Sequence, residues 1–159
     1  MSRELSKPMD HLGNIGLLNN YKIGFLCSRK VPASIILKTY DWAIEQRDKG
    51  TCIVSGFHSK IEKDVFDILI KGKQPIILVL ARGLKKIWKP KIKTLIDENR
   101  LLIISPFQEK IKRITEDTAK KRNEVIAEIS DKIFIPFYSD DGSLSKLFGN
   151  KTFNDKIKL

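Results

Sequence analysis

Short apolar runs alternate along most of this chain with longer stretches that have one apolar face. The apolar runs are bounded by polar residues or glycine, and they cover residues 22–27, 51–54, 75–81, 101–104 and 133–137. Runs of this length are typical of strands that are buried on both faces of a parallel sheet. The pattern therefore predicts a strand at each of these places.

Between the apolar runs, apolar residues recur three and four positions apart, which is the period of an amphipathic helix. This spacing predicts helices over residues 32–48, 59–71, 92–99 and 118–130. Gly50 lies just after the first helix, where a left-handed residue commonly ends a helix. Ser59 and Glu62 have the spacing of a capping box at the start of the second helix.

The alternation of strands and helices with short connections predicts one α/β domain. We expect a Rossmann-like three-layer sandwich, in which helices cover both faces of a mainly parallel sheet of five strands or more. The 75–81 strand is the most apolar and is expected at the centre of the sheet. Pro136 has no N–H to donate to a neighbouring strand, so we expect the 133–137 strand at an edge or irregular at its end.

Two terminal segments flank this domain, which we expect to cover residues 21–148. Residues 1–20 are interpreted as an N-terminal extension that packs on the sheet edge, with a short helix over 9–18. Residues 149–159 are interpreted as a polar C-terminal tail, which we expect to be loose.

In such sheets, ligands bind at the carboxyl ends of the strands, where the strand order reverses. The loops expected there carry Ser28, Arg29, Ser55, Gly56, His58 and Arg82. Arg122 is expected to join them, because it lies on the buried face of the 118–130 helix, one turn before Val125. We expect the three arginines and His58 to point toward one rim and to form an anion site with a helix N-terminus. The alternative is that Ser28 caps a turn and the neighbouring arginine is solvated.

Charge and composition narrow the class of partner. The 159 residues carry a formal net charge of +11, which favours binding of polyanions through counterion release. The alternative is an ordinary lysine-rich soluble protein. Cys27 and Cys52 fall in or beside expected strands, and two buried thiols favour the reducing cytoplasm. Because no apolar run approaches the roughly 20 residues that span a bilayer, and no signal peptide is recognisable, we expect a cytoplasmic protein without a membrane partner.

A basic segment follows the 75–81 strand, with Lys85, Lys86 and Lys89 around Trp88. One interpretation is a track for a nucleic acid backbone, on which Trp88 stacks a base. The other interpretation is that Trp88 is a partly buried anchor for the segment.

Other chemistry finds little support in the sequence. His11 and His58 are far apart and lack cysteine neighbours at metal-binding spacing, and Ser28 lacks a base that would activate it. Three carboxylates are interpreted as a solvated helix face and a helix cap rather than an acid/base pair: Glu62, Asp64 and Asp67. Walker and dinucleotide-binding glycine motifs are absent from the sequence. We therefore expect binding without a cofactor, a metal or catalysis.

Several short segments match one family pattern in order and spacing. They are Cys27-Ser28-Arg29, Ser55-Gly56 with Ile61-Glu62, 76–84, 101–107, 121–130 and Gly142-Ser143-Leu144. Together they resemble the DprA/Smf DNA-processing family, whose core is a Rossmann-like domain of the SLOG type. The corresponding family motifs include Gly-Ser-Arg, Ser-Gly-x-Ala-x-Gly-Ile-Asp and Arg-Asn-Arg.

The chain also departs from the family pattern. His58-Ser59-Lys60 stands where the family has Ala-x-Gly, Glu62 stands for the family's aspartate, and Glu124 replaces the second arginine of Arg-Asn-Arg. No winged-helix segment is recognisable after Leu144, so we interpret the chain as a reduced form of the family.

The resemblance implies binding of single-stranded DNA in DNA processing, uptake or recombination, and it implies self-association and contact with a recombinase. With the loop residues above, it gives one set of candidate residues for binding nucleic-acid phosphates: Ser28, Arg29, Ser55, Gly56, His58, Arg82, Lys121, Arg122, Asn123, Gly142 and Ser143.

A second hypothesis is a pocket for a free nucleotide. It includes a nucleoside-monophosphate phosphoribohydrolase like the related lysine-decarboxylase-like proteins, which carry a Pro-Gly-Gly-x-Gly-Thr-x-x-Glu turn. The segment 141–144 is only a remnant of that turn, and no glutamate follows at the required place. The sequence therefore disfavours the hydrolase chemistry but leaves nucleotide binding open.

Overall fold

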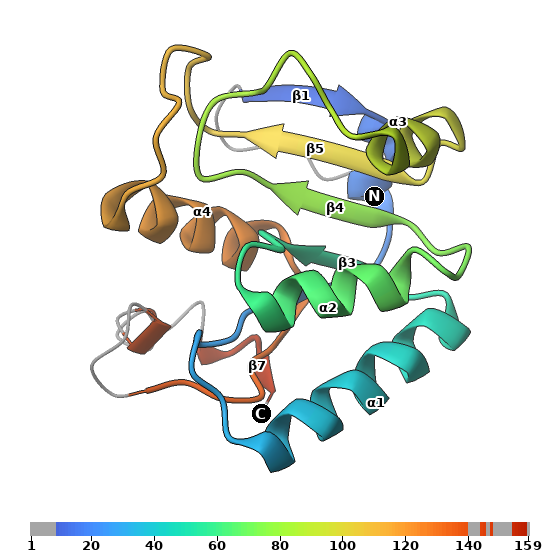
Figure 1. The fold of residues 1–159 in the computed structure, drawn as a ribbon, viewed down its shortest axis with the longest axis vertical. Coiled ribbons are helices and arrows are strands. Elements are labelled where there is room, and N and C mark those ends of the chain that lie inside the picture. The colour runs from blue at the N-terminus through green and yellow to red at the C-terminus, as the bar shows by residue number, and fades with distance from the viewer. Residues whose placement is uncertain (1–8, 140–143, 146, 148–153, 159) are drawn as a thin grey trace.

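A seven-stranded sheet runs through the computed structural model (Figure 1), which describes residues 9–139, 144–145, 147 and 154–158. Its strands are β1 (Asp10–Gly13), β2 (Lys22–Phe25), β3 (Cys52–Ser55), β4 (Ile76–Val79), β5 (Leu101–Ser105), β6 (Lys132–Phe134) and β7 (Ile157–Lys158). The strand order is β1-β5-β4-β3-β2-β6-β7. Neighbouring strands are parallel throughout, except that β1 is antiparallel to β5.

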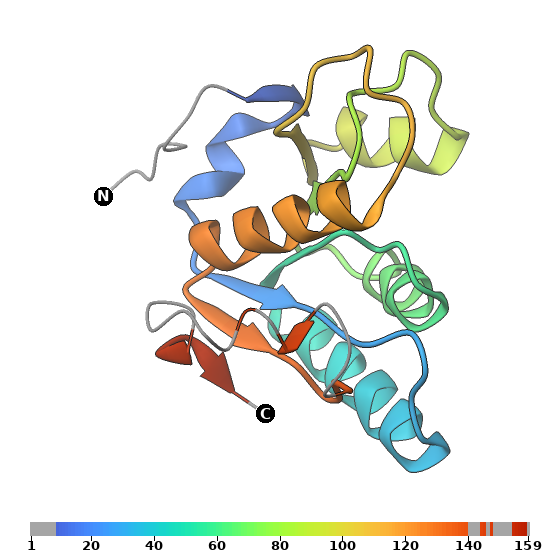
Figure 2. The same cartoon turned by 90° about the vertical axis from the view of Figure 1, so that its left-hand side faces the viewer.

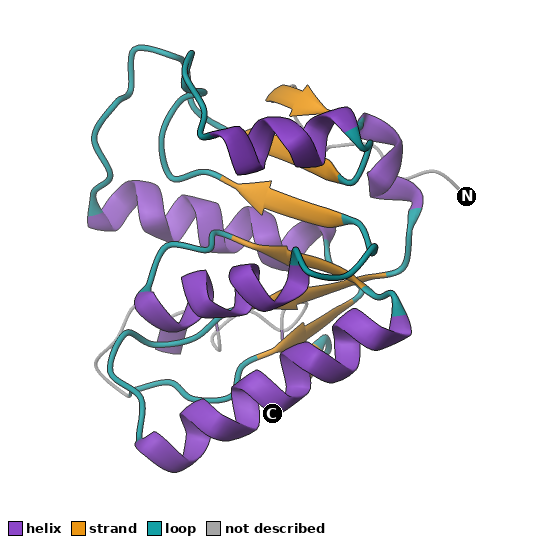
Figure 3. Ribbon diagram, turned by 45° about the vertical axis from the view of Figure 1, so that its right-hand side comes forward, coloured by secondary structure: helices purple, strands orange, loops and turns teal. Residues whose placement is uncertain are grey.

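Helices cover both faces of this sheet (Figures 2 and 3). The helices are η1 (a 3-10 helix, Ile15–Asn19), α1 (Ala33–Lys49), α2 (Lys60–Leu69), α3 (Pro90–Asp97) and α4 (Glu116–Ile129). One apolar core cluster joins η1 and α4 to the sheet, and a second cluster joins α1, α2 and α3 to it. The predicted three-layer sandwich with a mainly parallel sheet is therefore confirmed.

The predicted helix signals act as expected. Gly50 ends α1 with φ of 75°, in the left-handed region. Ser59 and Glu62 form a capping box at the start of α2. The helix α4 begins at Glu116, two residues earlier than predicted, because Thr115 and Thr118 form a second capping box.

Both ends of the sheet differ from the sequence prediction. Residues 10–13 form strand β1 rather than part of a helix, because this short segment pairs with the edge of β5. In the polar tail, Ile157–Lys158 forms β7, and the Ile133 N–H donates to Lys156 O at 2.8 Å. Strand β6 is therefore not at an edge, and Pro136 lies beyond its end. The middle of the sheet belongs to β3, with β4 beside it.

A lysine is buried where three segments meet. Lys22 begins β2 with a side chain that is 1% exposed. Its Nζ donates to Leu18 O at 2.9 Å and to Asn20 O at 2.8 Å, and lies 3.7 Å from Asp131 Oδ2. Because Asp131 lies between α4 and β6, this ammonium group ties η1, β2 and the α4–β6 connection together.

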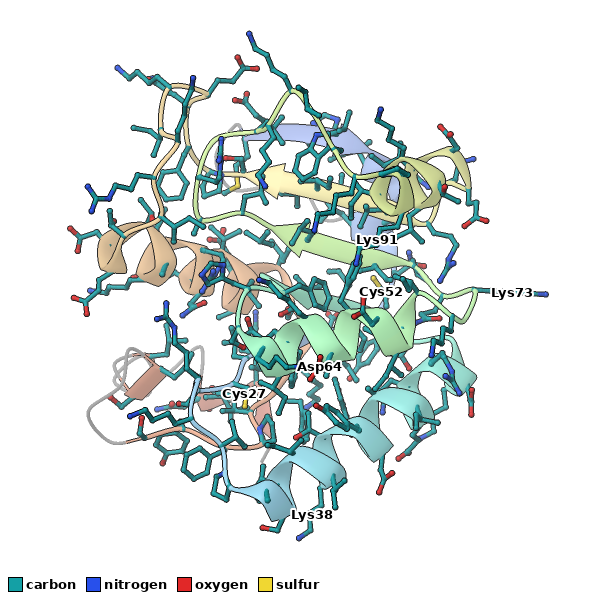
Figure 4. All side chains as sticks on the ribbon, viewed as in Figure 1. Cys27, Lys38, Cys52, Asp64, Lys73 and Lys91 are labelled. Carbon is teal, nitrogen blue, oxygen red and sulfur yellow. The ribbon has the colours of Figure 1, made fainter. Side chains whose placement is uncertain are left out.

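The two cysteines, Cys27 and Cys52, are buried and free (Figure 4). Of the helices that the structure describes, none has the length and apolar character needed to cross a bilayer.

Candidate nucleic-acid interface

A cavity of about 570 Å³ opens at the carboxyl ends of the strands. It lies beside β2, where the strand order reverses: the chain leaves β2 toward β3 on one side, and it later returns through α4 to β6 on the other. Ligands of open α/β sheets bind at such switch points. Its lining comes from the segments 26–30, 58–62 and 114–123, with Ser139 and Leu144.

Arg122 is the most deeply placed cation of this cavity. Its residue is 8% exposed and lines the cavity from the second turn of α4. Its Nε donates to Asn123 Oδ1 at 3.2 Å. Among the residues that the structure describes, no carboxylate lies within ion-pair distance of the guanidinium. A charge buried without a partner is costly, and its fork of donors suits a phosphate or carboxylate ligand.

The loop between β3 and α2 is shaped to admit the Arg122 side chain. A Cβ at Gly56 would lie 2.7 Å from Arg122 Cδ and 2.8 Å from its Nε, so any other residue would force the Arg122 side chain to shift. The preceding Ser55 is buried, and its Oγ accepts a hydrogen bond from Phe57 N at 3.2 Å. Phe57 has a φ of 45°, which costs on the order of 1–3 kcal/mol for a non-glycine residue. Its ring packs on Phe66 at 4.9 Å, which holds this conformation.

Replacing Gly56 with alanine should destabilise the protein by about 1–3 kcal/mol, the usual cost of overpacking. The methyl group would press on the Arg122 side chain and displace it. Urea unfolding of four proteins provides the test: the wild type, Gly56→Ala, Arg122→Ala and the double variant. In the double variant the clash is removed, so the alanine should cost much less than it does alone. Additive losses in this cycle would contradict the contact.

Further cations surround Arg122. Arg29 and Lys30 are exposed in the loop after β2, and His58 is half-buried before α2. Burial lowers the pKa of His58, and the charges of Arg122, Arg29 and Lys63 lower it further. Burial likewise lowers the pKa of Arg122; Glu62 opposes this effect and Arg29 adds to it. Burial is the main cause of both pKa shifts, and a bound anion would favour the charged form of both groups.

Glu62 is the buried acid of the cavity. Its residue is only 5% exposed, so its interpretation as part of a solvated helix face is wrong, whereas the capping role is confirmed. Its Oε1 accepts hydrogen bonds from His58 N at 3.0 Å and from Ser59 N at 3.2 Å. Capping turns the carboxylate back into the loop and occupies amides at the start of α2. Anion binding in the cavity therefore falls to the side-chain cations.

Cys27 and Ser28 line the cavity in the loop after β2. Ser28 N donates to Phe137 O at 3.1 Å, and its Oγ accepts from Ser139 N at 3.1 Å, so this serine joins two loops of the cavity. Burial raises the pKa of Cys27 to about 12, and the nearby Glu62 adds to the shift. At neutral pH this thiol is therefore protonated and is a poor nucleophile.

The structure brings together some of the predicted site residues and separates others. Those that line the cavity are Ser28, Arg29, His58, Arg122 and Asn123. Arg82 does not reach the cavity lining; its Nε donates to Gly83 O at 3.2 Å in its own loop. The role of Arg82 in phosphate binding therefore stays a prediction. Lys121 is also outside the lining. Gly142 and Ser143 lie outside the described residues.

Several lining residues were not predicted from the sequence. Lys30, Thr115 and Glu116 line the cavity. Thr115 followed by two acidic residues is a signal for a helix start, and it would have placed the α4 N-terminus at the site. Ser139 bonds Ser28 across a separation of 111 residues, for which the sequence has no local signal.

The family model of DNA recombination-mediator protein A matches residues 8–147 of this chain. The chain belongs to this family. The sequence resemblance to DprA is thereby confirmed on most of the chain. A search of curated proteins gave no match.

Two solved DprA structures share the fold of this DprA-family chain. One is DNA processing protein A from Helicobacter pylori, described for its unique single-stranded DNA binding mode. It has a TM-score of 0.75 and 18% identity, over 96% of this chain and 73% of that one. The other is DprA from Streptococcus pneumoniae, with a TM-score of 0.63 and 22% identity, over 80% of this chain and 45% of that one. The chain therefore spans only part of either relative.

Proposed function

We propose that this DprA-family protein binds single-stranded DNA and holds a backbone phosphate at Arg122, without catalysis. The observation that carries the proposal is the buried guanidinium, which lines the cavity and has no carboxylate partner among the described residues. Arginine binds phosphate oxygens through two parallel hydrogen bonds. Contacts of this kind fix a strand in place without reading its sequence.

Two further observations support a polymer rather than a small anion. The net charge of +11 exceeds what one phosphate group requires, and a polyanion gains affinity from each counterion released. The family match and the Helicobacter pylori relative described with single-stranded DNA agree with this choice. Arg29, Lys30 and His58 would hold the phosphates next to the one at Arg122.

A salt series tests the proposal against a nucleotide pocket. Fluorescence anisotropy would follow a labelled oligothymidylate, with thymidine monophosphate as competitor. We expect log K to fall with log salt by about 0.7 per phosphate contact, and the mononucleotide to compete weakly. Displacement by a low concentration of mononucleotide would assign the cavity to a free nucleotide. Release of free base from nucleoside monophosphates would assign it to phosphoribohydrolase chemistry.

Binding should strengthen as the pH falls, because of His58. In the free protein, burial and three neighbouring cations hold the pKa of His58 below its ordinary 6.5, so the imidazole is neutral at pH 7. A bound phosphate favours the imidazolium and raises this pKa. Binding therefore takes up a proton, and affinity rises as the pH falls from the bound-state pKa toward the free-state pKa.

The measurement is the Kd for an oligothymidylate between about pH 8 and pH 5, the range in which histidine titrates. The variant His58→Gln should flatten the profile. The chain has two histidines, and the control His11→Gln changes the exposed one on β1. A profile that His11→Gln flattens and His58→Gln leaves unchanged would contradict a phosphate beside His58.

A cytoplasmic location is part of the proposal and is supported by the two buried free thiols. Self-association and contact with a recombinase, which the family resemblance implies, stay predictions.

A further inference from the structure

Two loops meet beside the cavity and form a basic ridge. The loop after β4 and the loop between β5 and α4 run side by side in Figures 1 and 2. Gly83 N donates to Ile111 O at 2.7 Å, which joins them. We define the loop ridge by its exposed cations: Lys85, Lys86, Lys110, Lys112 and Arg113.

Backbone contact fixes the two loops against each other. A Cβ at Gly83 would lie 2.2 Å from Gln108 O and 2.6 Å from Glu109 Cα. These are main-chain atoms, so no side-chain movement would relieve the contact. The loop ridge is therefore one surface with a set spacing between its two halves, rather than two separate loops.

The loop ridge has a strong excess of positive charge. Glu109 is the only acid within residues 82–93 and 106–115. In the described part of the chain, none of the five ridge cations forms an ion pair. Exposed cations without partners are free to neutralise the charges of a ligand.

Trp88 is a partly buried anchor at the base of the ridge. Its ring packs against the core beneath α2 and α3, and its indole nitrogen is buried. Lys85 Nζ lies over this ring, 5.6 Å from its centre. Of the two interpretations of Trp88, the anchor is confirmed. The neighbouring Ile87 is 85% exposed and offers an apolar contact at the same surface.

The loop ridge continues directly from the cavity. Thr115 and Ile114 line the cavity, and Arg113 is the next residue toward the ridge. Two residues of extended chain span at most about 7 Å. A strand that leaves Arg122 over the start of α4 would therefore meet Arg113 first and the lysines of the ridge after it.

We propose that the loop ridge is a second part of the nucleic-acid site, which holds the single strand after it leaves the cavity. The inference rests on the proposed function, because the cavity sets where the strand begins. A flexible polyanion fits the two parts, since Ile114, Thr115 and Glu116 line the cavity at the start of α4 and the ridge residue Arg113 directly precedes them. The ridge supplies charge and the cavity supplies the anchored phosphate.

The test compares two oligothymidylates, of about 4 and about 16 nucleotides, the limits of common single-strand sites. The ridge variant is Lys110→Ala/Lys112→Ala/Arg113→Ala. We expect it to bind the short oligonucleotide as the wild type does. Binding of the long one should weaken about tenfold, and its salt slope should fall by about 2, which is 0.7 for each lost phosphate contact.

The matched control removes three exposed lysines from another surface: Lys71→Ala/Lys73→Ala/Lys93→Ala (Figure 4 labels Lys73). It should keep most of the long-oligonucleotide affinity, and thermal unfolding should show that both triple variants fold. A ridge variant that binds the long oligonucleotide no worse than the control overturns the inference while the proposed function stands. Equal wild-type affinity for both lengths also overturns it. If Arg122→Met loses binding of both oligonucleotides and the ridge variant binds both as the wild type does, the cavity alone is the site and the inference is wrong.

Anionic vesicles provide the other comparison. Vesicles of phosphatidylserine and phosphatidylcholine should not compete with the long oligonucleotide for the wild type. If they bind tightly through the ridge cations and the long oligonucleotide does not, the ridge belongs to a membrane surface and the inference is wrong. If no oligonucleotide binds the wild type at all, the proposed function itself fails.

Discussion

Replacing Arg122 with methionine should remove most single-stranded DNA binding and leave the fold at least as stable. Hydrogen bonds to charged groups contribute about 1.5–3 kcal/mol, so affinity should fall about 10- to 150-fold. Arg122 is buried without a carboxylate partner among the described residues. An unpaired charge is costly to bury, and an apolar side chain of similar size avoids that cost. The measurements are anisotropy with an oligothymidylate and urea unfolding.

Lys120→Met is the matched control for this prediction. It removes the same charge from an exposed position of α4 that does not line the cavity. It should reduce binding only slightly and leave the unfolding free energy nearly unchanged. If Arg122→Met unfolds the protein and Lys120→Met does not, Arg122 is a structural residue. Equal losses of binding in both variants would mean that net charge, and not the cavity, governs affinity.

Replacing Lys22 with alanine should cost about 3–5 kcal/mol of stability, the usual loss when one member of a buried charged network is removed. Lys22 is 1% exposed. Its Nζ donates to Leu18 O and Asn20 O and lies 3.7 Å from Asp131 Oδ2. Removal would leave buried acceptors without this donor. A domain of ordinary stability, about 5–15 kcal/mol, would then be close to unfolding.

Urea unfolding measures this loss, and Lys49→Ala, at an exposed position of α1, is the control. The double variant Lys22→Ala/Asp131→Asn should recover part of the loss, because it removes the charge left behind. In the wild type the backbone N–H of residue 22 donates to Asp131 Oδ2 at 2.8 Å. The asparagine of the double variant keeps a side-chain oxygen for this backbone N–H. A loss within about 0.5 kcal/mol for Lys22→Ala, as for an ordinary surface residue, would contradict the account.

Side-chain patterns were enough to predict the centre of the fold. Parallel strands buried on both faces have continuous apolar sequences, so β2 to β6 were all found. The capping box of Ser59 and Glu62 depends on local spacing and was predictable for the same reason. The helical period also placed Arg122 on the buried face of α4, where the structure has it.

Edge strands and long-range polar contacts were not predictable from such patterns. β1 and β7 are held by backbone hydrogen bonds to β5 and β6, which any sequence can make, so their short polar segments gave no signal. The burial of Lys22 depends on carbonyls that only the folded chain brings together. Arg82 follows a strand end as expected, but its Nε donates to Gly83 O within its own loop, and it is outside the cavity lining.

Part of the candidate site was also predictable from the sequence. Strand ends meet at one edge of a parallel sheet, so Ser28, Arg29 and His58 could be grouped from the sequence. The contact of Gly56 with Arg122 joins a loop to a helix far along the chain. Only the packed structure shows that this glycine is there to admit the arginine.

A titration by nuclear magnetic resonance with a short oligothymidylate tests the central claim most directly. The chain, at 18.2 kDa, is small enough for its backbone amides and arginine Nε–H groups to be followed individually. We predict the largest shifts at the Arg122 Nε–H, the Gly56 amide and the Asn123 side-chain amide, because Gly56 and Asn123 both contact the Arg122 side chain. Saturating binding that leaves these three signals in place, with shifts centred on other elements, would contradict a strand held in the cavity.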